Sequence, residues 1–330
     1  MQFRSEFNPP KFNKQININD TVMLIGSCFT DQIGNKISTH KIRTLQNPNG
    51  ILFNPISISN AIETYLLNRK FNTDDLFFRN ELYGSWLHHT SFSGLDKHQV
   101  LNKINTAISG ANNFLKKADW LIITLGSSFV YEKLTEANDE YCGVVANCHK
   151  VPADKFVRRL INSGEIKNVL QKLCTRLHEF NKNLKIIFTI SPVRHLRDGF
   201  VENNRSKANL IDAVHSVVDS SCILYFPSYE LIIDDLRDYR FYAEDLVHPN
   251  YFATQYVWEK FIKSCIDENT QDLLIEINDI NAAMLHKPFN PQSQAHKKFL
   301  KKYAEKTMAI QERFPSLDFE NELKYFSLPG

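Results

Sequence analysis

The chain has 330 residues, of which 43% are hydrophobic and 23% are charged, the composition of an ordinary globular protein. Its 39 basic and 37 acidic side chains give a net charge of only +2, which argues against nucleic acid or an anionic membrane as the main partner. No apolar, uncharged run reaches the roughly 18 residues that a transmembrane helix needs. The first ten residues lack the apolar segment of a secretory signal, and we expect a cytoplasmic protein.

Cysteine and histidine spacing gives no sign of a metal or cofactor. The six cysteines are scattered without a CxxC pair, so we expect free thiols, with Cys28 buried in the core. No HxH or HxxxH pattern occurs among the histidines of the candidate regions. We therefore expect no metal site and no cofactor.

Short apolar runs alternate with segments of helical period. Strands are expected at 21–25, 120–125, 185–190 and 222–226, and a turn at 47–50. Helices are expected directly after the first strand, at 58–67, 99–115, 156–180 (with Gly164 as a point of interruption), 207–218 and after Pro249.

This alternation predicts an α/β fold: a mostly parallel sheet between two layers of helices. We expect one such domain over residues 1–270, with an inserted aromatic-rich lid near 71–98. Residues 271–330 should form a helical extension that packs on it, since its basic stretch 296–303 also carries Phe299, Leu300 and Tyr303.

Two weak signals lie where strands of such a sheet end. Ser27 follows the first strand at the start of a helix, a position that suits a nucleophile or, equally, a helix cap. Asp245 and His248 follow the last strand, and an Asp can hold one ring nitrogen of a His that acts as a base. A parallel sheet would bring both loops to the same edge.

Several segments together resemble the GSCFA family of the SGNH/GDSL hydrolase superfamily. They are Gly26-Ser27-Cys28-Phe29, residues 47–55 (NPNGILFNP), 124–128 (TLGSS), 147–150 (NCHK), 191–195 (SPVRH) and Asp245-x-x-His248, spanning roughly residues 20–260. The resemblance implies a three-layer α/β/α fold and ester hydrolysis through an acyl-enzyme.

Carried over by position, the resemblance makes Ser27 the nucleophile, His248 the base and Asp245 its orienting partner. The backbone N–H groups of Ser27 and Gly50 would form the oxyanion hole. The superfamily also places an Asn side chain in its third block, Gly-x-Asn-Asp, whereas this chain has Gly126-Ser127-Ser128-Phe129. Asn147 or Ser128 would have to supply the missing donor.

Other polar and aromatic residues are candidates for substrate binding. Arg194 and His195 follow the strand at 185–190, where Arg194 could bind a polar group of the substrate or pair with Asp198. Trp86 and His89 in the lid segment, together with His149, could line an acyl or sugar pocket, or could serve only in packing.

The sequence thus predicts a serine esterase that acts on an O-acyl group of a small molecule or carbohydrate, such as an O-acetyl group. An acyltransferase with the same triad, or a ligand-binding module with little catalysis, are the alternatives. We expect no nucleic-acid or membrane partner, and the sequence does not define an oligomeric state.

Overall fold

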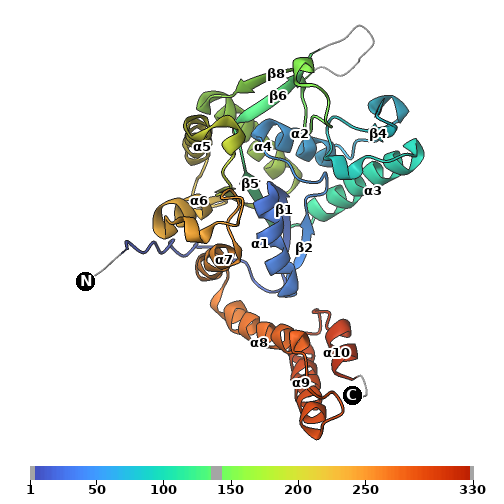
Figure 1. Cartoon of the computed structure of the whole chain (residues 1–330), viewed down its shortest axis with the longest axis vertical. Helices are drawn as coiled ribbons and strands as arrows, with labels where there is room; N and C mark the ends of the chain where they lie inside the picture. The colour runs from blue at the N-terminus through green and yellow to red at the C-terminus, as the bar shows by residue number, and fades with distance from the viewer. Residues whose placement is uncertain (1–3, 135–142, 328–330) are drawn as a thin grey trace.

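The computed structural model describes residues 4–134 and 143–327 and is built around one parallel sheet (Figure 1). The strand order is β10-β9-β5-β1-β2, and every neighbouring pair is parallel. The strands are β1 (Thr21–Gly26), β2 (Arg43–Gln46), β5 (Trp120–Leu125), β9 (Lys185–Ile190) and β10 (Ile223–Tyr225). Three of the predicted strands, β1, β5 and β9, therefore form its centre, and the fourth, β10, is an edge strand. The other edge strand, β2, is one that the sequence did not reveal.

Helices cover both faces of this sheet, which confirms the predicted three-layer α/β/α fold. Alternate residues of a strand face opposite sides, so Leu24 and Ile122 pack with one layer, whereas Met23 and Leu121 pack with the other. The first layer contains α1 (Cys28–Thr39) and α7 (Tyr251–Cys265). The second contains α2 (Pro55–Leu66), α3 (Lys97–Leu115), α4 (Ser163–Phe180) and α5 (Phe200–His215).

The helix predicted over residues 156–180 is wrong in its first part. Residues Phe156–Leu160 form strand β8, which pairs antiparallel with β6 (Phe129–Lys133), and β7 (Gly143–Val144) completes a small sheet. The helix α4 begins only at Ser163, where the side chain of Asn162 caps the N–H of Glu165. Residues 156–160 were misassigned because the strand they pair with lies 23 to 31 residues away in sequence, from Lys133↔Phe156 to Phe129↔Leu160, and helical periodicity does not register such a nonlocal contact.

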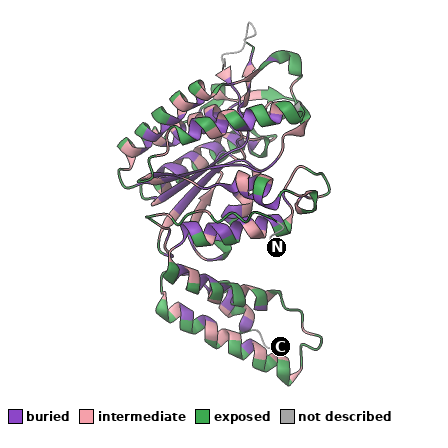
Figure 2. Cartoon of the chain, turned by 90° about the vertical axis from the view of Figure 1, so that its left-hand side faces the viewer, coloured by how far each residue is buried: buried purple, intermediate pink, exposed green. Residues whose placement is uncertain are grey.

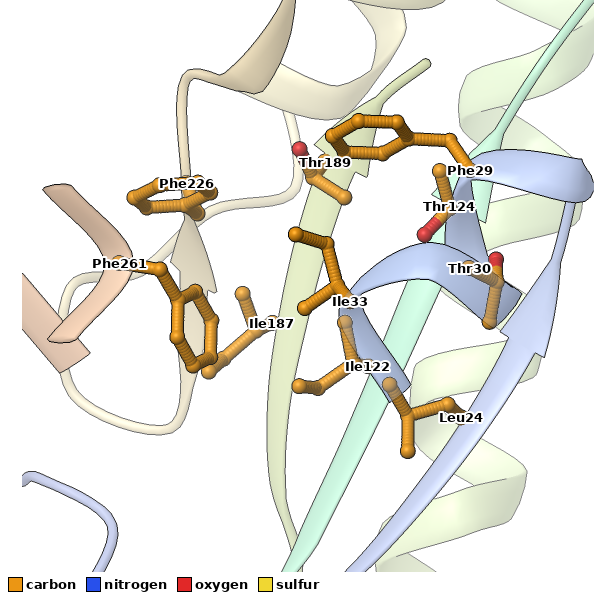
Figure 3. A pocket seen from close by; sticks show the side chains of 10 residues that line it. All are labelled: Leu24, Phe29, Thr30, Ile33, Ile122, Thr124, Ile187, Thr189, Phe226 and Phe261. Carbon is orange, nitrogen blue, oxygen red and sulfur yellow. The ribbon is translucent and has the colours of Figure 1, made fainter. Parts of the chain in front are cut away.

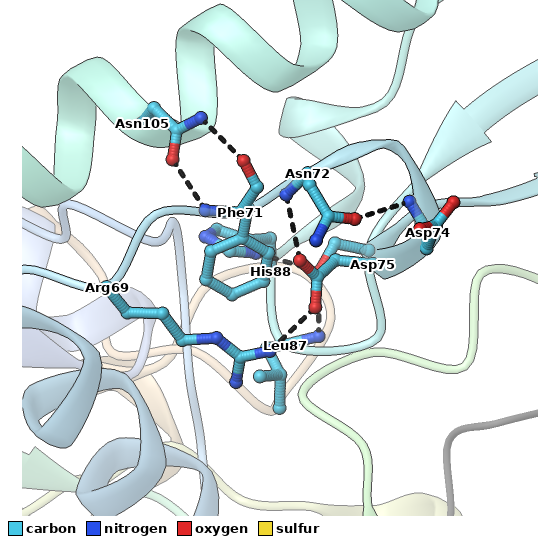
Figure 4. Close-up of polar contacts among 9 residues, drawn as sticks. Arg69, Phe71, Asn72, Asp74, Asp75, Leu87, His88 and Asn105 are labelled. Carbon is cyan, nitrogen blue, oxygen red and sulfur yellow. Dashed lines mark hydrogen bonds and ion pairs between the residues drawn. The ribbon is translucent and has the colours of Figure 1, made fainter.

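The segment near 71–98 contains a short hairpin, β3 (Phe77–Arg79) with β4 (Leu82–Gly84). Polar contacts fix its beginning: Arg69 pairs with Asp75 at 2.6 Å, and the side chain of Asn105 bonds both backbone groups of Phe71 (Figure 4). His88 packs its ring on Phe71 at a centroid distance of 5.3 Å. That this ordered segment serves as a lid stays a prediction.

Three helices at the C-terminal end form a separate layer below the sheet domain (Figure 2). They are α8 (Glu268–Leu285), α9 (Gln294–Arg313) and α10 (Glu320–Phe326). Lys41 ties this layer to the sheet domain, with Nζ 2.7 Å from Glu322 and above the ring of Phe319. Over residues 4–134 and 143–327 no helix is both long and apolar enough to cross a membrane.

The remaining helical turns are short and lie in loops. They are α6 (Ser228–Glu230), which continues as a π-helical turn over Leu231–Leu236, and 3₁₀ turns at Thr73–Asp75, Thr90–Phe92, Ala153–Lys155, Leu196–Asp198 and Tyr239–Phe241.

Candidate active site

Ser27 lies in the tight turn between β1 and α1, where it is the N-cap residue of the helix. Its side chain is fully buried, yet its Oγ neither caps the helix nor meets another hydrogen-bond partner. Gly26 is required here, because its φ is +147° and a Cβ would lie 2.2 Å from the carbonyl oxygen of Thr124. Backbone contacts thus hold the turn, and the hydroxyl of Ser27 has no structural task.

The segment after β2 is bound to this turn. Oδ1 of Asn47 accepts the N–H of Gly26 at 2.8 Å, and its Nδ2 donates to Asp31 of α1 at 2.6 Å. The N–H of Leu52 donates to the carbonyl of Gly26 at 2.9 Å. Residues 47–52 and the nucleophile turn therefore form one hydrogen-bonded unit.

The two N–H groups expected in an oxyanion hole both donate within the chain. That of Ser27 bonds the carbonyl of Thr124 at 3.2 Å, and that of Gly50 bonds the carbonyl of Asn47 at 2.7 Å. A Cβ on Gly50 would lie 2.4 Å from the Cβ of His89, which places His89 against this loop. The oxyanion role of either N–H stays a prediction, and it requires a substrate oxygen to compete with a carbonyl.

The loop after β5 passes beside Ser27, but the side chain of its Ser128 is bonded to α5. A Cβ on Gly126 would lie 3.3 Å from the Cβ of Ser27 and 3.2 Å from the ring of Phe53, so these three residues are in close contact. The hydroxyl of Ser128 is fully buried and donates to the carbonyl of Ser206 on α5 at 3.1 Å. In this arrangement Ser128 serves the packing of α5.

His149 and Trp86 form an aromatic cluster with Phe77 beside the small sheet of β6, β7 and β8. Asn147 is bonded to the backbone of His149. Oδ1 of Asn147 accepts the N–H of His149 at 2.8 Å, and Nε2 of His149 donates to the carbonyl of Ser85 at 3.0 Å. Phe77 stacks on Trp86 at 4.3 Å, and burial lowers the pKa of His149. These contacts agree with packing, and a contact of the three residues with substrate stays a prediction.

His89 adopts a defined tautomer at the edge of this region. Its Nδ1 accepts the N–H of Ser91 at 3.2 Å, so in the neutral ring the proton is on Nε2. Partial burial lowers its pKa, while Asp31 acts in the opposite direction.

Asp245 and His248 form a hydrogen-bonded pair on the loop before α7. Nδ1 of His248 lies 2.7 Å from Oδ2 of Asp245, and Oδ1 accepts the N–H groups of Val247 and His248. These backbone hydrogen bonds and then the imidazole lower the pKa of Asp245 to about 2, so that the carboxylate is charged at neutral pH. Because Nδ1 bonds Asp245, Nε2 is the ring nitrogen of His248 that could act as a base. Nε2 is not hydrogen-bonded to Oγ of Ser27 in this structure.

A backbone hydrogen bond joins the base loop to the loop after β9. The N–H of Arg194 donates to the carbonyl of Val247 at 3.2 Å, and His248 is near enough for its charge to act on His195. The guanidinium of Arg194 lies over the ring of Tyr242, 4.6 Å from its centroid. Pairing of Arg194 with Asp198 falls outside the described residues, since the side chain of Asp198 is not among them.

His195 is partly exposed as a residue, but one of its ring nitrogens is buried. Its ring meets Phe53 edge-on at 5.6 Å, and its Nε2 is buried without a hydrogen-bond partner. Burial, then the charges of Lys207 and His248, lower the pKa of His195 to about 3, so the ring is neutral at neutral pH.

Lys207 is a site residue that sequence reasoning missed. It is almost fully buried on α5, and its Nζ donates to the carbonyls of Gly126 and Ser191, at 2.6 and 2.7 Å, at the ends of β5 and β9. Burial lowers its pKa to about 7. The signal was present in the spacing, because Lys207 shares the inward face of α5 with Leu210 and Val214, where a charged residue is unexpected.

An apolar cavity lies behind the nucleophile turn, between α1, the sheet and α7 (Figure 3). Ile33, Ile187 and Phe261 are among its walls, and Thr30 lines it with a buried Oγ1 that lacks a partner. The space has room for one water molecule at most, so it is too small for an acyl chain. Cys28 is half-buried against the hydrophobic core rather than fully buried in it, and burial raises its pKa.

Comparison with known proteins identifies the family. The model of the GSCFA family matches residues 21–261, and that of the GSCFA domain protein C-terminal domain matches residues 277–328. The chain therefore belongs to the GSCFA family, and its C-terminal helices belong to a region with a family model of its own. No curated protein shows significant sequence similarity to it.

Solved structures with a similar chain path are distant. A carbohydrate esterase family 3 protein from Talaromyces cellulolyticus is 10% identical, with 79% of this chain and 99% of that chain covered and a TM-score of 0.34. The acetyl xylan esterase Est2A from Butyrivibrio proteoclasticus is 11% identical, with 78% and 64% covered and a TM-score of 0.36. Within the described residues, no three His, Cys, Asp or Glu side chains are grouped as metal ligands would be.

Proposed function

We propose that this protein is a serine esterase in which Ser27 is the nucleophile, His248 the base and Asp245 its orienting partner. The observation that supports the proposal is the presence of two unlike chemical features at the candidate residues. One is a buried serine hydroxyl with no structural partner, and the other is an imidazole whose Nδ1 is held by a charged carboxylate. Residues with these chemical properties are what acyl transfer to serine needs.

The reaction then proceeds in two balanced halves. Oγ of Ser27 bonds to the acyl carbon as its proton passes to Nε2 of His248, and the tetrahedral intermediate collapses by breaking the bond to the alcohol oxygen. The alcohol leaves with the proton from His248. Water attacks the acyl-enzyme, gives one proton to His248 and releases the carboxylic acid, while Oγ of Ser27 regains its proton. Asp245 stabilises the imidazolium in both halves.

The substrate class is an O-acyl ester of a small molecule or carbohydrate, with an O-acetyl group as the first candidate. This part rests on the superfamily resemblance of the motifs. The aromatic cluster of Trp86 and His149 and the nearby His89 would form one wall of the pocket, and Arg194 would contact the alcohol part of the ester.

Acyl transfer to a second alcohol is the alternative that one observation favours. The side chain of Ser27 is fully buried, and an acyl-enzyme kept from water survives until another acceptor arrives. If transfer dominates, adding an alcohol acceptor raises the rate of substrate consumption and gives a new ester. If hydrolysis dominates, free carboxylic acid accounts for all of the acyl group released.

Turnover of 4-nitrophenyl acetate and of an O-acetylated sugar by the full chain tests the proposal. We expect Ser27→Ala and His248→Ala each to lose at least about 10³-fold in kcat. Ser221→Ala, at an exposed serine, is the matched control and should keep full activity. A folded wild-type protein that binds such esters without turnover would replace the esterase by a ligand-binding module.

A further inference from the structure

The candidate oxyanion hole lacks a side-chain donor at the place where the superfamily pattern has an Asn. Ser128 is committed to Ser206 on α5, and the Oδ1 of Asn147 is committed to the N–H of His149. The N–H groups of Ser27 and Gly50 and the hydroxyl of Ser128 are thus engaged within the chain, and of the donors that the motifs suggest only the Nδ2 of Asn147 has no partner among the described residues. An esterase of this kind gains from a further donor to the negative charge that develops in the tetrahedral intermediate.

His195 has a ring nitrogen that bonds no other group among the described residues. Its Nε2 is buried and has no hydrogen-bond partner, which is costly for a polar atom unless a ligand completes it. The Oγ of Ser27 is buried and unpartnered in the same way. One of these two unpartnered atoms could bond the acyl carbon of a substrate and the other could bond its oxygen.

Contacts through Phe53 connect His195 with the nucleophile turn. The ring of Phe53 meets His195 edge-on at 5.6 Å, and the Cδ1 of Phe53 and the Cβ of Ser27 lie 3.2 and 3.3 Å from one position at Gly126. The hydrogen bond of Arg194 to Val247 joins the loop of His195 to the base loop, and His248 is near enough for its charge to act on His195. The loop of His195 therefore connects with both the nucleophile turn and the base loop.

The surroundings of His195 suit a neutral donor. The ammonium group of Lys207, bound to the carbonyls of Gly126 and Ser191, and the nearby His248 both disfavour a second positive charge. With burial these charges lower the pKa of His195 to about 3. A neutral imidazole donates one N–H without competing with His248 for the proton of Ser27.

We propose that the Nε2–H of His195 donates a hydrogen bond to the oxyanion of the tetrahedral intermediate, in place of the Asn side chain that this chain lacks. The inference rests on the proposed esterase function. No proton is transferred, since the ring only donates a hydrogen bond, and Nδ1 remains unprotonated. His195 is in this account a catalytic residue rather than a binder of the alcohol part of the substrate.

Two substitutions test the N–H donor of His195 separately from the packing of its ring. His195→Phe keeps a ring against Phe53 but removes the N–H, whereas His195→Gln keeps an N–H donor near the position of Nε2. For 4-nitrophenyl acetate, we expect His195→Phe to lower kcat roughly 10²- to 10³-fold with KM within about twofold. His195→Gln should recover at least about tenfold of that loss. His215→Phe, at an exposed position of α5, is the control for exchanging an imidazole for a phenyl ring.

The outcomes are distinct from those for the esterase function. A kcat of His195→Phe within about threefold of the wild-type value would overturn this inference alone. An equal loss of kcat in His195→Phe and His195→Gln would do the same. A wild-type protein without turnover and without acylation of Ser27 would overturn both. If His195→Phe fails to fold, His195→Met, which matches Gln in size and has no N–H, takes its place in the comparison with His195→Gln.

Discussion

The two halves of the candidate site are held in different ways. The nucleophile half is buried, and hydrogen bonds across the sheet join Gly26, Asn47 and Leu52 into one unit. The base half is exposed and local, because Asp245 alone gathers the hydrogen bonds of Val247 and His248 within three residues. The difference indicates that changes to the nucleophile half should alter stability as well as catalysis, whereas changes to the base half should alter catalysis alone.

Asp245→Asn tests the exposed half and should have the largest catalytic effect after loss of the nucleophile or base. Oδ1 of Asn can still accept the two backbone N–H groups, but its amide N–H favours the wrong tautomer of His248 and cannot stabilise the imidazolium. We expect kcat to fall roughly 10²- to 10⁴-fold, with an unchanged midpoint of urea unfolding. A large loss of stability would show that the loop depends on charge and would contradict the comparison.

Lys207→Met tests the buried half. The carbonyls of Gly126 and Ser191 would lose their shared donor in a fully buried place. We expect a loss of about 3 kcal/mol in the free energy of unfolding, measured with urea, together with lower activity. Lys172→Met, at an exposed position of α4, is the control. An unaltered free energy of unfolding for Lys207→Met would mean that the hydrogen bonds of Lys207 to Gly126 and Ser191 do not stabilise the fold.

Part of the pH dependence of the free energy of unfolding should come from the buried His88. Burial, then His149 and Arg69, lower the pKa of His88 to about 3, below its value of about 6.5 in the unfolded chain. Its neutral form therefore stabilises the fold above pH 6.5, and that contribution is lost as the pH falls toward 3.

His88→Gln should make this dependence shallower, by up to about 1.4 kcal/mol per pH unit between pH 6 and pH 4. Urea unfolding of both proteins at several pH values measures the two slopes. Equal slopes would show that His88 does not titrate with unfolding.

Sequence reasoning recovered the central sheet because the information was local. The strands at 120–125 and 185–190 are apolar runs whose burial is decided by composition, and their bounds were predicted correctly. Strand β8 and the small sheet were missed because they depend on pairing between distant segments. The same limit applies to Lys207, whose role depends on two carbonyls that only the fold brings together.

The candidate site was predictable to the extent that motifs carry it. The spacing of Asp245 and His248 predicted their pairing, and the structure has the expected Nδ1–Oδ2 contact. Motifs did not reveal that Ser128 bonds α5, that the N–H of Gly50 is engaged, or that His195 has an unpartnered Nε2. Each of these depends on side-chain and backbone partners far away in sequence.

The most direct test of the account is the mass of the intact protein after treatment with a fluorophosphonate, with the modified residue mapped by peptide sequencing. The account predicts one adduct, on Ser27, that forms at neutral pH in folded protein, is absent in Ser27→Ala and forms far more slowly in His248→Ala. An adduct on another residue, no adduct at all, or equal labelling of Ser27 in wild type and His248→Ala would contradict it.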